Sequence, residues 1–193
     1  MVVSSSNSYL TSNHEVVSIN KNSTNQFKLR SINQNGQIQI YQSSYRGSYS
    51  SVIRDSLRNA ALGRKVLLVQ LMKGGVKQGI ANAQKLCGNL TWVRSSNSYD
   101  QYESENIDED ITQAINNSIL ELWELCKKEL LSGEYDQIIL DEIFLAIEMK
   151  IISKDDLIST LENRFISGDV ILTGTSIPKN FLLMADQITE LRS

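Results

Sequence analysis

The sequence is poor in several residue types on which common catalytic and structural sites depend. Its 193 residues include one histidine, one proline and two cysteines. The lone histidine, His14, lies in a polar N-terminal segment, which argues against a zinc site and against a histidine-based catalytic triad. Cys87 and Cys126 are far apart and lack metal-type spacing. We therefore expect two buried, reduced thiols in a cytoplasmic protein.

Long apolar runs and a large net charge are missing as well. No run approaches the roughly 18 apolar residues of a membrane-spanning helix. Residues 1–10 lack the basic start and apolar core of a secretory signal. The formal charge of −3 gives no reason to expect nucleic acid or an acidic membrane surface as a partner. These absences leave a single folded domain of ordinary size as the simplest expectation.

Residues 1–34 differ in composition from the rest of the chain. They are rich in Ser, Asn, Thr and Gln, and no period of two or 3.6 residues is sustained. This predicts a flexible leader at 1–34 before a folded domain at 35–193. The alternative is an arm that folds over a partner subunit or over the site, anchored by Val16, Val17, Ile19, Phe27 and Leu29.

From residue 35 onward, predicted strands alternate with predicted helices. Apolar runs predict strands at 37–41, 65–71, 90–93, 137–142, 169–173 and 187–191. Helical spacing or helix-start signals predict helices from about 48 to Gly63, near 81–86, from 111 to 132, at 144–150, from 153 to 163 and after Pro178. The alternation predicts an α/β fold with a mostly parallel sheet and helices on both faces.

Three smaller expectations go with this pattern. Trp123 lies off the apolar stripe of its helix, so we expect it at the edge of the core. The run from Ser153 to Asp156 resembles a capping box with Asp in place of Glu. Trp92 is interpreted as a packing residue of a strand.

The stretch from Gly36 to Ser51 has the frame of a phosphate-binding loop. A short strand, a loop of small and polar residues and a helix follow one another, so that backbone N–H groups and a helix N-terminus meet. The frame predicts a three-layer, P-loop NTPase-like domain. The candidate ligand-binding residues of this loop are Ser43, Ser44, Arg46, Gly47, Ser48, Tyr49 and Ser50. Such loops usually contain several glycines and a lysine, whereas here only Gly47 stands at a glycine position and Ser48 follows it.

A second candidate element is the apolar strand that ends in Asp141 and Glu142. Nucleotide-binding sheets place a carboxylate at such a strand end, near the phosphate loop, where it binds Mg²⁺ or the water around the ion. Many strands end in acids, so a solvated strand end is the alternative when the motif is taken alone.

Five segments, in this order, resemble the P-loop-type ATP:corrinoid adenosyltransferases over about residues 36–192. They are Gly36–Tyr41, Gly63–Gly74, Tyr135–Glu142, Val170–Gly174 and Ala185–Arg192. The resemblance implies Mg-ATP as cosubstrate, transfer of the 5′-deoxyadenosyl group to the reduced cobalt of a corrinoid, and a homodimer. It also implies a metal site at Asp141 and Glu142 and ligand contacts from Lys73, Thr173 and Gly174.

The loop departs from the pattern of that family, which reads roughly Thr-Gly-Asn/Asp-Gly-Lys-Gly-Lys-Thr-Thr. Two of its glycines are Ser43 and Tyr45 here, the second lysine is Ser48, and a threonine is Tyr49. Arg46 stands for the other lysine. The aromatic segment that borders the corrinoid in the family has no clear counterpart in residues 95–106.

Three functional hypotheses follow from these observations. The first is a non-catalytic or weakly nucleotide-binding relative that acts as a binding or regulatory module. The second is an active adenosyltransferase whose loop is rebuilt around Arg46, Ser48 and Ser50. The third is a partner-binding scaffold that uses the leader or a dimer face. ATP and Mg²⁺ are thus conditional ligands, and a corrinoid is doubtful.

Overall fold

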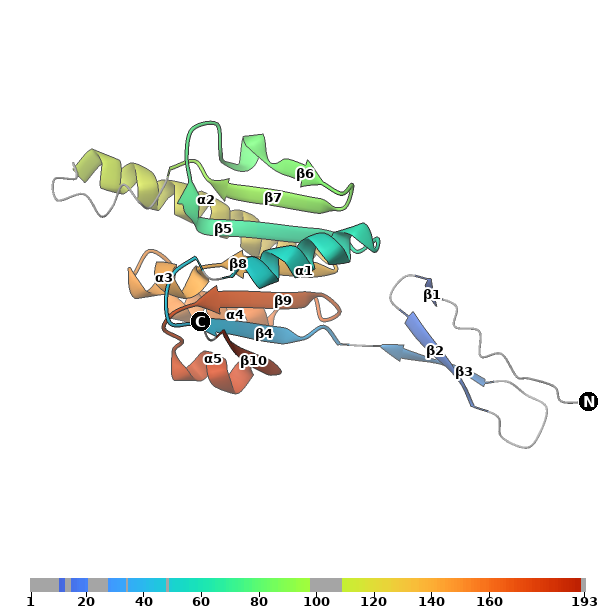
Figure 1. The fold of residues 1–193 in the computed structure, drawn as a ribbon. Coiled ribbons are helices and arrows are strands. Elements are labelled where there is room, and N and C mark those ends of the chain that lie inside the picture. The colour runs from blue at the N-terminus through green and yellow to red at the C-terminus, as the bar shows by residue number, and fades with distance from the viewer. Residues whose placement is uncertain are drawn as a thin grey trace, which may run out of the picture.

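The architecture was obtained as a computed structural model, which describes residues 11–12, 15–20, 28–33, 35–47, 49–97 and 109–191. The main sheet has seven strands in the order β10-β4-β9-β8-β5-β7-β6. The strands are β4 (Ile38–Ser43), β5 (Val66–Gly74), β6 (Gln84–Leu86), β7 (Leu90–Ser95), β8 (Gln137–Asp141), β9 (Asp169–Gly174) and β10 (Gln187–Leu191). Every pair is parallel except β6–β7 (Figure 1). The predicted α/β fold with a mostly parallel sheet is confirmed.

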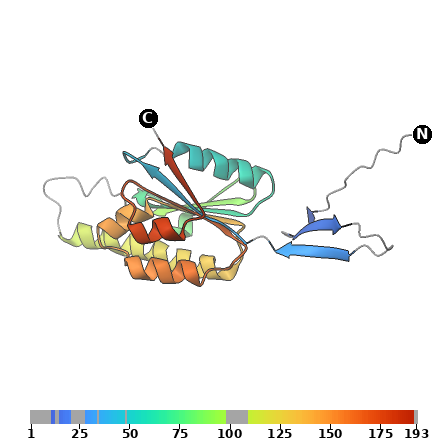
Figure 2. The ribbon, with the colours of Figure 1, turned by 90° about the horizontal axis from the view of Figure 1, so that it is seen from below.

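The helices cover the two faces of this sheet unequally. Helix α1 (Ser50–Ala61) lies on one face, and the other face carries α2 (Glu109–Ser132), α3 (Ile143–Glu148), α4 (Lys154–Glu162) and α5 (Lys179–Met184) (Figure 2). A short 3₁₀ helix, η1 (Ile80–Asn82), precedes β6. None of the described helices combines the length and apolarity needed to cross a lipid bilayer.

The sheet is two-sided because side chains alternate along each strand. Ile38 and Ile40 of β4 face the larger core, under α2 to α5, whereas Val66 and Leu68 of β5 face the smaller core, under α1. Both cores are mainly apolar, with a few buried polar residues such as Gln137 and Ser118. At the carboxyl ends of the strands the inward positions of the α1 face become polar, with Ser43, Gln70, Asp141 and Thr173 all buried. The candidate site residues therefore lie at this edge.

A separate antiparallel sheet is formed by β1 (Thr11–Ser12), β2 (Glu15–Asn20) and β3 (Lys28–Asn33). Val16 is paired with Thr11 on one side and Ile32 on the other. Regular strands thus occur within 1–34, where the composition predicts a leader without regular structure. The domain boundary near residue 35 stays a prediction.

Four smaller expectations are wrong. The segment near 81–86 is the 3₁₀ turn η1 followed by strand β6 rather than a helix. Trp123 lies in the core with 2 % of its surface exposed, and its indole N–H donates to Asp156 at 2.7 Å. Ser153 precedes α4, but its side chain makes no capping hydrogen bond. Cys126 is buried as expected, whereas Cys87 is exposed in the β6–β7 turn.

Candidate functional site

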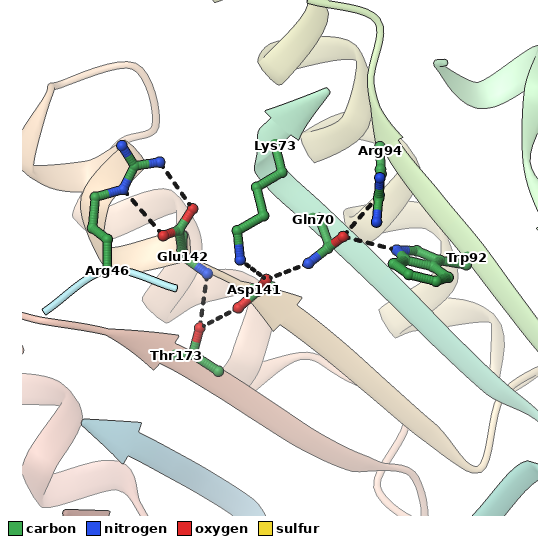
Figure 3. Close-up of polar contacts among 8 residues, drawn as sticks. All are labelled: Arg46, Gln70, Lys73, Trp92, Arg94, Asp141, Glu142 and Thr173. Carbon is green, nitrogen blue, oxygen red and sulfur yellow. Dashed lines mark hydrogen bonds and ion pairs between the residues drawn. The ribbon is translucent and has the colours of Figure 1, made fainter. Parts of the chain in front are cut away.

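Four neighbouring strands deliver the predicted site residues to one edge of the sheet. Strand β4 leads into the loop that carries Arg46, β9 ends near Thr173, β8 ends at Asp141, and β5 carries Lys73. Because these strands are parallel and adjacent in the order β4-β9-β8-β5, their carboxyl ends meet. Figure 3 shows the resulting cluster of polar side chains.

Asp141 lies at the centre of this cluster and is 2 % exposed. Its Oδ1 accepts a hydrogen bond from the hydroxyl of Thr173 at 2.8 Å. Its Oδ2 accepts from the amide of Gln70 at 2.7 Å and from the ammonium group of Lys73 at 3.3 Å. A buried carboxylate needs donors and a counter-charge, and these three contacts supply both.

The side-chain amide of Gln70 has a defined orientation, with its NH₂ group towards Asp141 and its oxygen towards Trp92 and Arg94. The Oε1 of Gln70 accepts from the indole N–H of Trp92 at 3.0 Å and from Nε of Arg94 at 2.9 Å. Two donors on the oxygen leave the amide NH₂ directed at Asp141 (Figure 3). The strand register explains this arrangement, because Gln70 is paired with Asp141 on one side and Arg94 on the other.

Sequence reasoning missed the roles of Gln70, Trp92 and Arg94. Trp92 is more than a packing residue, since Arg94 also stacks over its ring at 4.3 Å from the centroid. One signal was visible: Gln70 is the single polar residue within the apolar run from Val66 to Met72. A polar side chain in a strand buried on both faces requires a partner.

Glu142 follows β8 in the left-handed backbone region, with φ of 60°. Its backbone N–H donates to the hydroxyl of Thr173 at 2.8 Å, so this hydroxyl accepts from Glu142 and donates to Asp141. The Glu142 carboxylate, 2 % exposed, pairs in a bidentate manner with Arg46, at 3.1 Å from Nε to Oε1 and 3.2 Å from Nη2 to Oε2. The loop is thereby attached to the end of β8 (Figure 3).

Tyr49 directly precedes α1 and packs in the smaller core, with 1 % of its surface exposed. Burial raises the pKa of its phenol above the usual 10.0, and the negative charges of Glu142 and Asp141 raise the pKa further. The Ser43 backbone lowers the pKa in part, and the described residues offer the buried hydroxyl no side-chain partner. The aromatic side chain of Tyr49 is thus part of the smaller core under α1.

The other predicted ligand-binding residues are less closely connected to the acids. Ser44 and Ser50 are exposed, and no hydrogen bond joins either to Asp141 or Glu142 within the described chain. Gly47 has φ of +80°, a conformation that suits glycine. A Cβ at Gly174 would come within 2.6 Å of the Cβ of Phe144, so this glycine permits close packing of α3 on β9. Ser48 lies outside the described residues.

An open hollow of about 270 Å³ adjoins the loop. Its lining consists of Gln42, Ser43, Ser44, Thr175, Glu190 and Leu191. The lining offers hydroxyl and amide groups and one carboxylate but no lysine or arginine. Its electrostatics therefore favour neutral ligands over polyanions.

The predicted metal ligands can be compared with what Mg²⁺ requires. Magnesium in proteins takes one or two carboxylates, with waters or phosphates completing an octahedron. Here all four carboxylate oxygens of Asp141 and Glu142 accept hydrogen bonds, and two cations contact them. The described residues contain no group of three or more His, Cys, Asp or Glu side chains able to hold a metal. As arranged, these residues do not fit a bound Mg²⁺.

The parallel sheet, the loop and helix after β4 and the acids after β8 together define the class: an α/β domain consistent with the P-loop NTPase-like fold. The model of the family described as ATP:corrinoid adenosyltransferase BtuR/CobO/CobP matches residues 34–193. The chain belongs to this family, as the five segments of the sequence indicate.

Similar curated proteins agree with this assignment. The chain is 23 % identical over 165 residues to the corrinoid adenosyltransferase of Escherichia coli K12, covering 81 % of this chain and 76 % of that protein. It is 24 % identical over the same length to corrinoid adenosyltransferase CobA of Salmonella typhimurium, with the same coverage. An uncharacterised protein of Nostoc sp. is 25 % identical over 181 residues, which span 86 % of this chain but only 46 % of that protein.

Proposed function

We propose that this protein is a non-catalytic or weakly nucleotide-binding member of the corrinoid adenosyltransferase family that serves as a binding or regulatory module. The observation that carries the proposal is the position of Tyr49. Its side chain is buried in the smaller core under α1, and its phenol is close enough to Asp141 and Glu142 to be affected by their charges. The family pattern has a small hydroxyl residue at this position. The buried phenol thus takes the place of the threonine that the family resemblance puts near Mg²⁺.

The charges around the loop support the same proposal. Arg46, the cation contributed by the described part of the loop, is engaged by Glu142. Lys73 is engaged by Asp141, and the adjoining hollow adds no basic side chain. Loss of one preorganised electrostatic contact in a catalytic site commonly costs about 3–4 kcal/mol, a factor of a few hundred or more in rate. The altered loop gives up several such contacts.

The test is an adenosylation assay with cob(I)alamin and Mg-ATP, using the E. coli corrinoid adenosyltransferase as the positive control. We expect the full chain to turn over at less than about one hundredth of the control rate, in line with the loss of one or more preorganised contacts. The variant Ser48→Lys with Tyr49→Thr reintroduces the family's lysine and hydroxyl, and we expect it to bind ATP more tightly than the parent chain. A parent rate within tenfold of the control would refute the proposal.

A second candidate function, active adenosyl transfer, is favoured by one observation. Lys73 and Thr173 both contact Asp141 at the sheet edge, and the family resemblance selects all three residues. If the enzyme is active, these residues would orient ATP, and Arg46 would release Glu142 to contact phosphate. Calorimetry that detects no heat of Mg-ATP binding at millimolar concentration would exclude this candidate.

A further inference from the structure

The acid pair at the end of β8 is electrically balanced by the chain itself. Asp141 and Glu142 are adjacent and both are 2 % exposed. Two carboxylates side by side and shielded from water repel each other, so each needs a counter-charge. Lys73 contacts Asp141 at 3.3 Å, and Arg46 contacts Glu142 at 3.1 Å. The four groups in direct contact carry two positive and two negative charges, which sum to zero, while Arg94 reaches the acids only through Gln70.

The geometry of these contacts is also complete. Each of the four carboxylate oxygens accepts at least one hydrogen bond, from Arg46, Thr173, Gln70 or Lys73. The donors are themselves held in place, since Gln70 is oriented by Trp92 and Arg94. A divalent cation would have to displace at least one of the two side-chain cations and would face repulsion from the other. Figure 3 shows both cations directed at the acids.

We propose that Arg46 and Lys73 are built-in counter-ions that replace a divalent metal, so that a ligand at this edge of the sheet binds as its metal-free species. The Arg46–Glu142 and Lys73–Asp141 pairs supply the charge balance that Mg²⁺ provides in nucleotide-binding sheets of this type. The part of the inference that concerns a ligand at this edge rests on the proposed function. The metal measurement described next does not require a ligand.

The chain offers a matched control for a metal-binding experiment. Arg64 and Lys65 form ion pairs with Asp169 and Glu134, at 2.7 and 3.5 Å. These residues lie at the opposite, amino-terminal edge of the sheet. Arg64→Gln with Lys65→Gln therefore removes the same two charges as Arg46→Gln with Lys73→Gln, without touching the acid pair.

The experiment measures Mn²⁺ binding by electron paramagnetic resonance on the full chain. We expect the wild-type chain and the Arg64/Lys65 control to bind Mn²⁺ only weakly, and the Arg46/Lys73 variant to bind at least tenfold more tightly. Tight Mn²⁺ binding by the wild type that Asp141→Asn abolishes would overturn the inference. So would an Arg46/Lys73 variant that gains no more affinity than the control. If that double variant does not fold, Lys73→Gln alone is measured against Lys65→Gln.

A second measurement addresses the ligand directly. ATP is titrated into the wild-type chain by calorimetry, once in EDTA and once in excess Mg²⁺. We expect dissociation constants that agree within twofold, and a value at least tenfold lower in Mg²⁺ would contradict the proposal. If ATP binding depends on Mg²⁺ and the chain shows no adenosylation activity, this inference is overturned while the proposed function stands. Turnover in that assay would refute the proposed function, whatever the Mn²⁺ result.

Discussion

Replacing Thr173 by valine removes one hydroxyl from the centre of the site and leaves the shape of the side chain nearly unchanged. Thr173 has no exposed surface, so the variant creates no new cavity and water cannot replace the lost group. The change leaves Oδ1 of Asp141 without its donor and the backbone N–H of Glu142 without its acceptor. The effect on stability therefore reports the value of these two hydrogen bonds.

The expected magnitude follows from these two contacts. A hydrogen bond to a charged group contributes about 1.5–3 kcal/mol, and a buried N–H without a partner costs about 1–3 kcal/mol. The two contacts share one hydroxyl and are coupled, so their energies do not simply add. We expect Thr173→Val to lower the free energy of unfolding by about 3 kcal/mol. For a domain of this size the melting temperature would then fall by about 6–12 °C.

The assay is urea denaturation followed by circular dichroism, with Thr160→Val as the control. Thr160 is 7 % exposed, and its hydroxyl donates only to the backbone carbonyl of Asp156 within α4, at 2.7 Å. This carbonyl belongs to the first turn of the helix, so the control should cost less than about 1 kcal/mol. If the two variants differ by less than about 0.5 kcal/mol with equal m-values, the Thr173 hydroxyl does not stabilise the site.

Three further predictions concern single side chains. The pKa of the Tyr49 phenol is raised in the folded chain above the usual 10.0. Its contribution to the free energy of unfolding is therefore fully present below pH 10 and is lost as the pH rises above 10. Between pH 9 and 11 the free energy of unfolding of the wild-type chain, measured by urea titration, should fall by about 1.4 kcal/mol more than that of Tyr49→Phe. Equal decreases in the two chains would contradict the burial of the phenol. A disulfide reagent at pH 8 should modify one thiol, Cys87, in the native chain and two after unfolding. Fast reaction of Cys126, whose pKa burial raises, would show that the α2 core opens. Gln70→Leu should destabilise the chain by about 2 kcal/mol, because Asp141, Trp92 and Arg94 each lose one hydrogen bond. Gln39→Leu, at a half-buried position of β4, is its control, and equal effects in urea would show that Gln70 does not organise the site.

The elements that were predicted well are determined by residues close together in the sequence. The run from Lys65 to Leu71 is nearly continuously apolar and is found, from Val66 onward, within the strand β5, and Gly63 follows the end of α1 with φ of 97°. The elements that were missed depend on contacts between distant segments. Trp123 is buried because α4 supplies Asp156 as a partner for its indole, which the helical stripe of α2 does not reveal. Cys87 is exposed because it occupies a turn with φ of 50°, outside the sheet.

The sequence by itself determined the fold class and the edge of the sheet at which the candidate site residues lie. Strand length, apolar runs and turn residues act within a few positions, and parallel strands must bring their carboxyl ends together. It also selected Arg46, Lys73, Asp141, Glu142 and Thr173 as candidates. Only the tertiary structure decided how these groups are paired. An ion pair between residues 96 positions apart, Arg46 with Glu142, depends on the order and register of the strands between them, which local pattern does not encode.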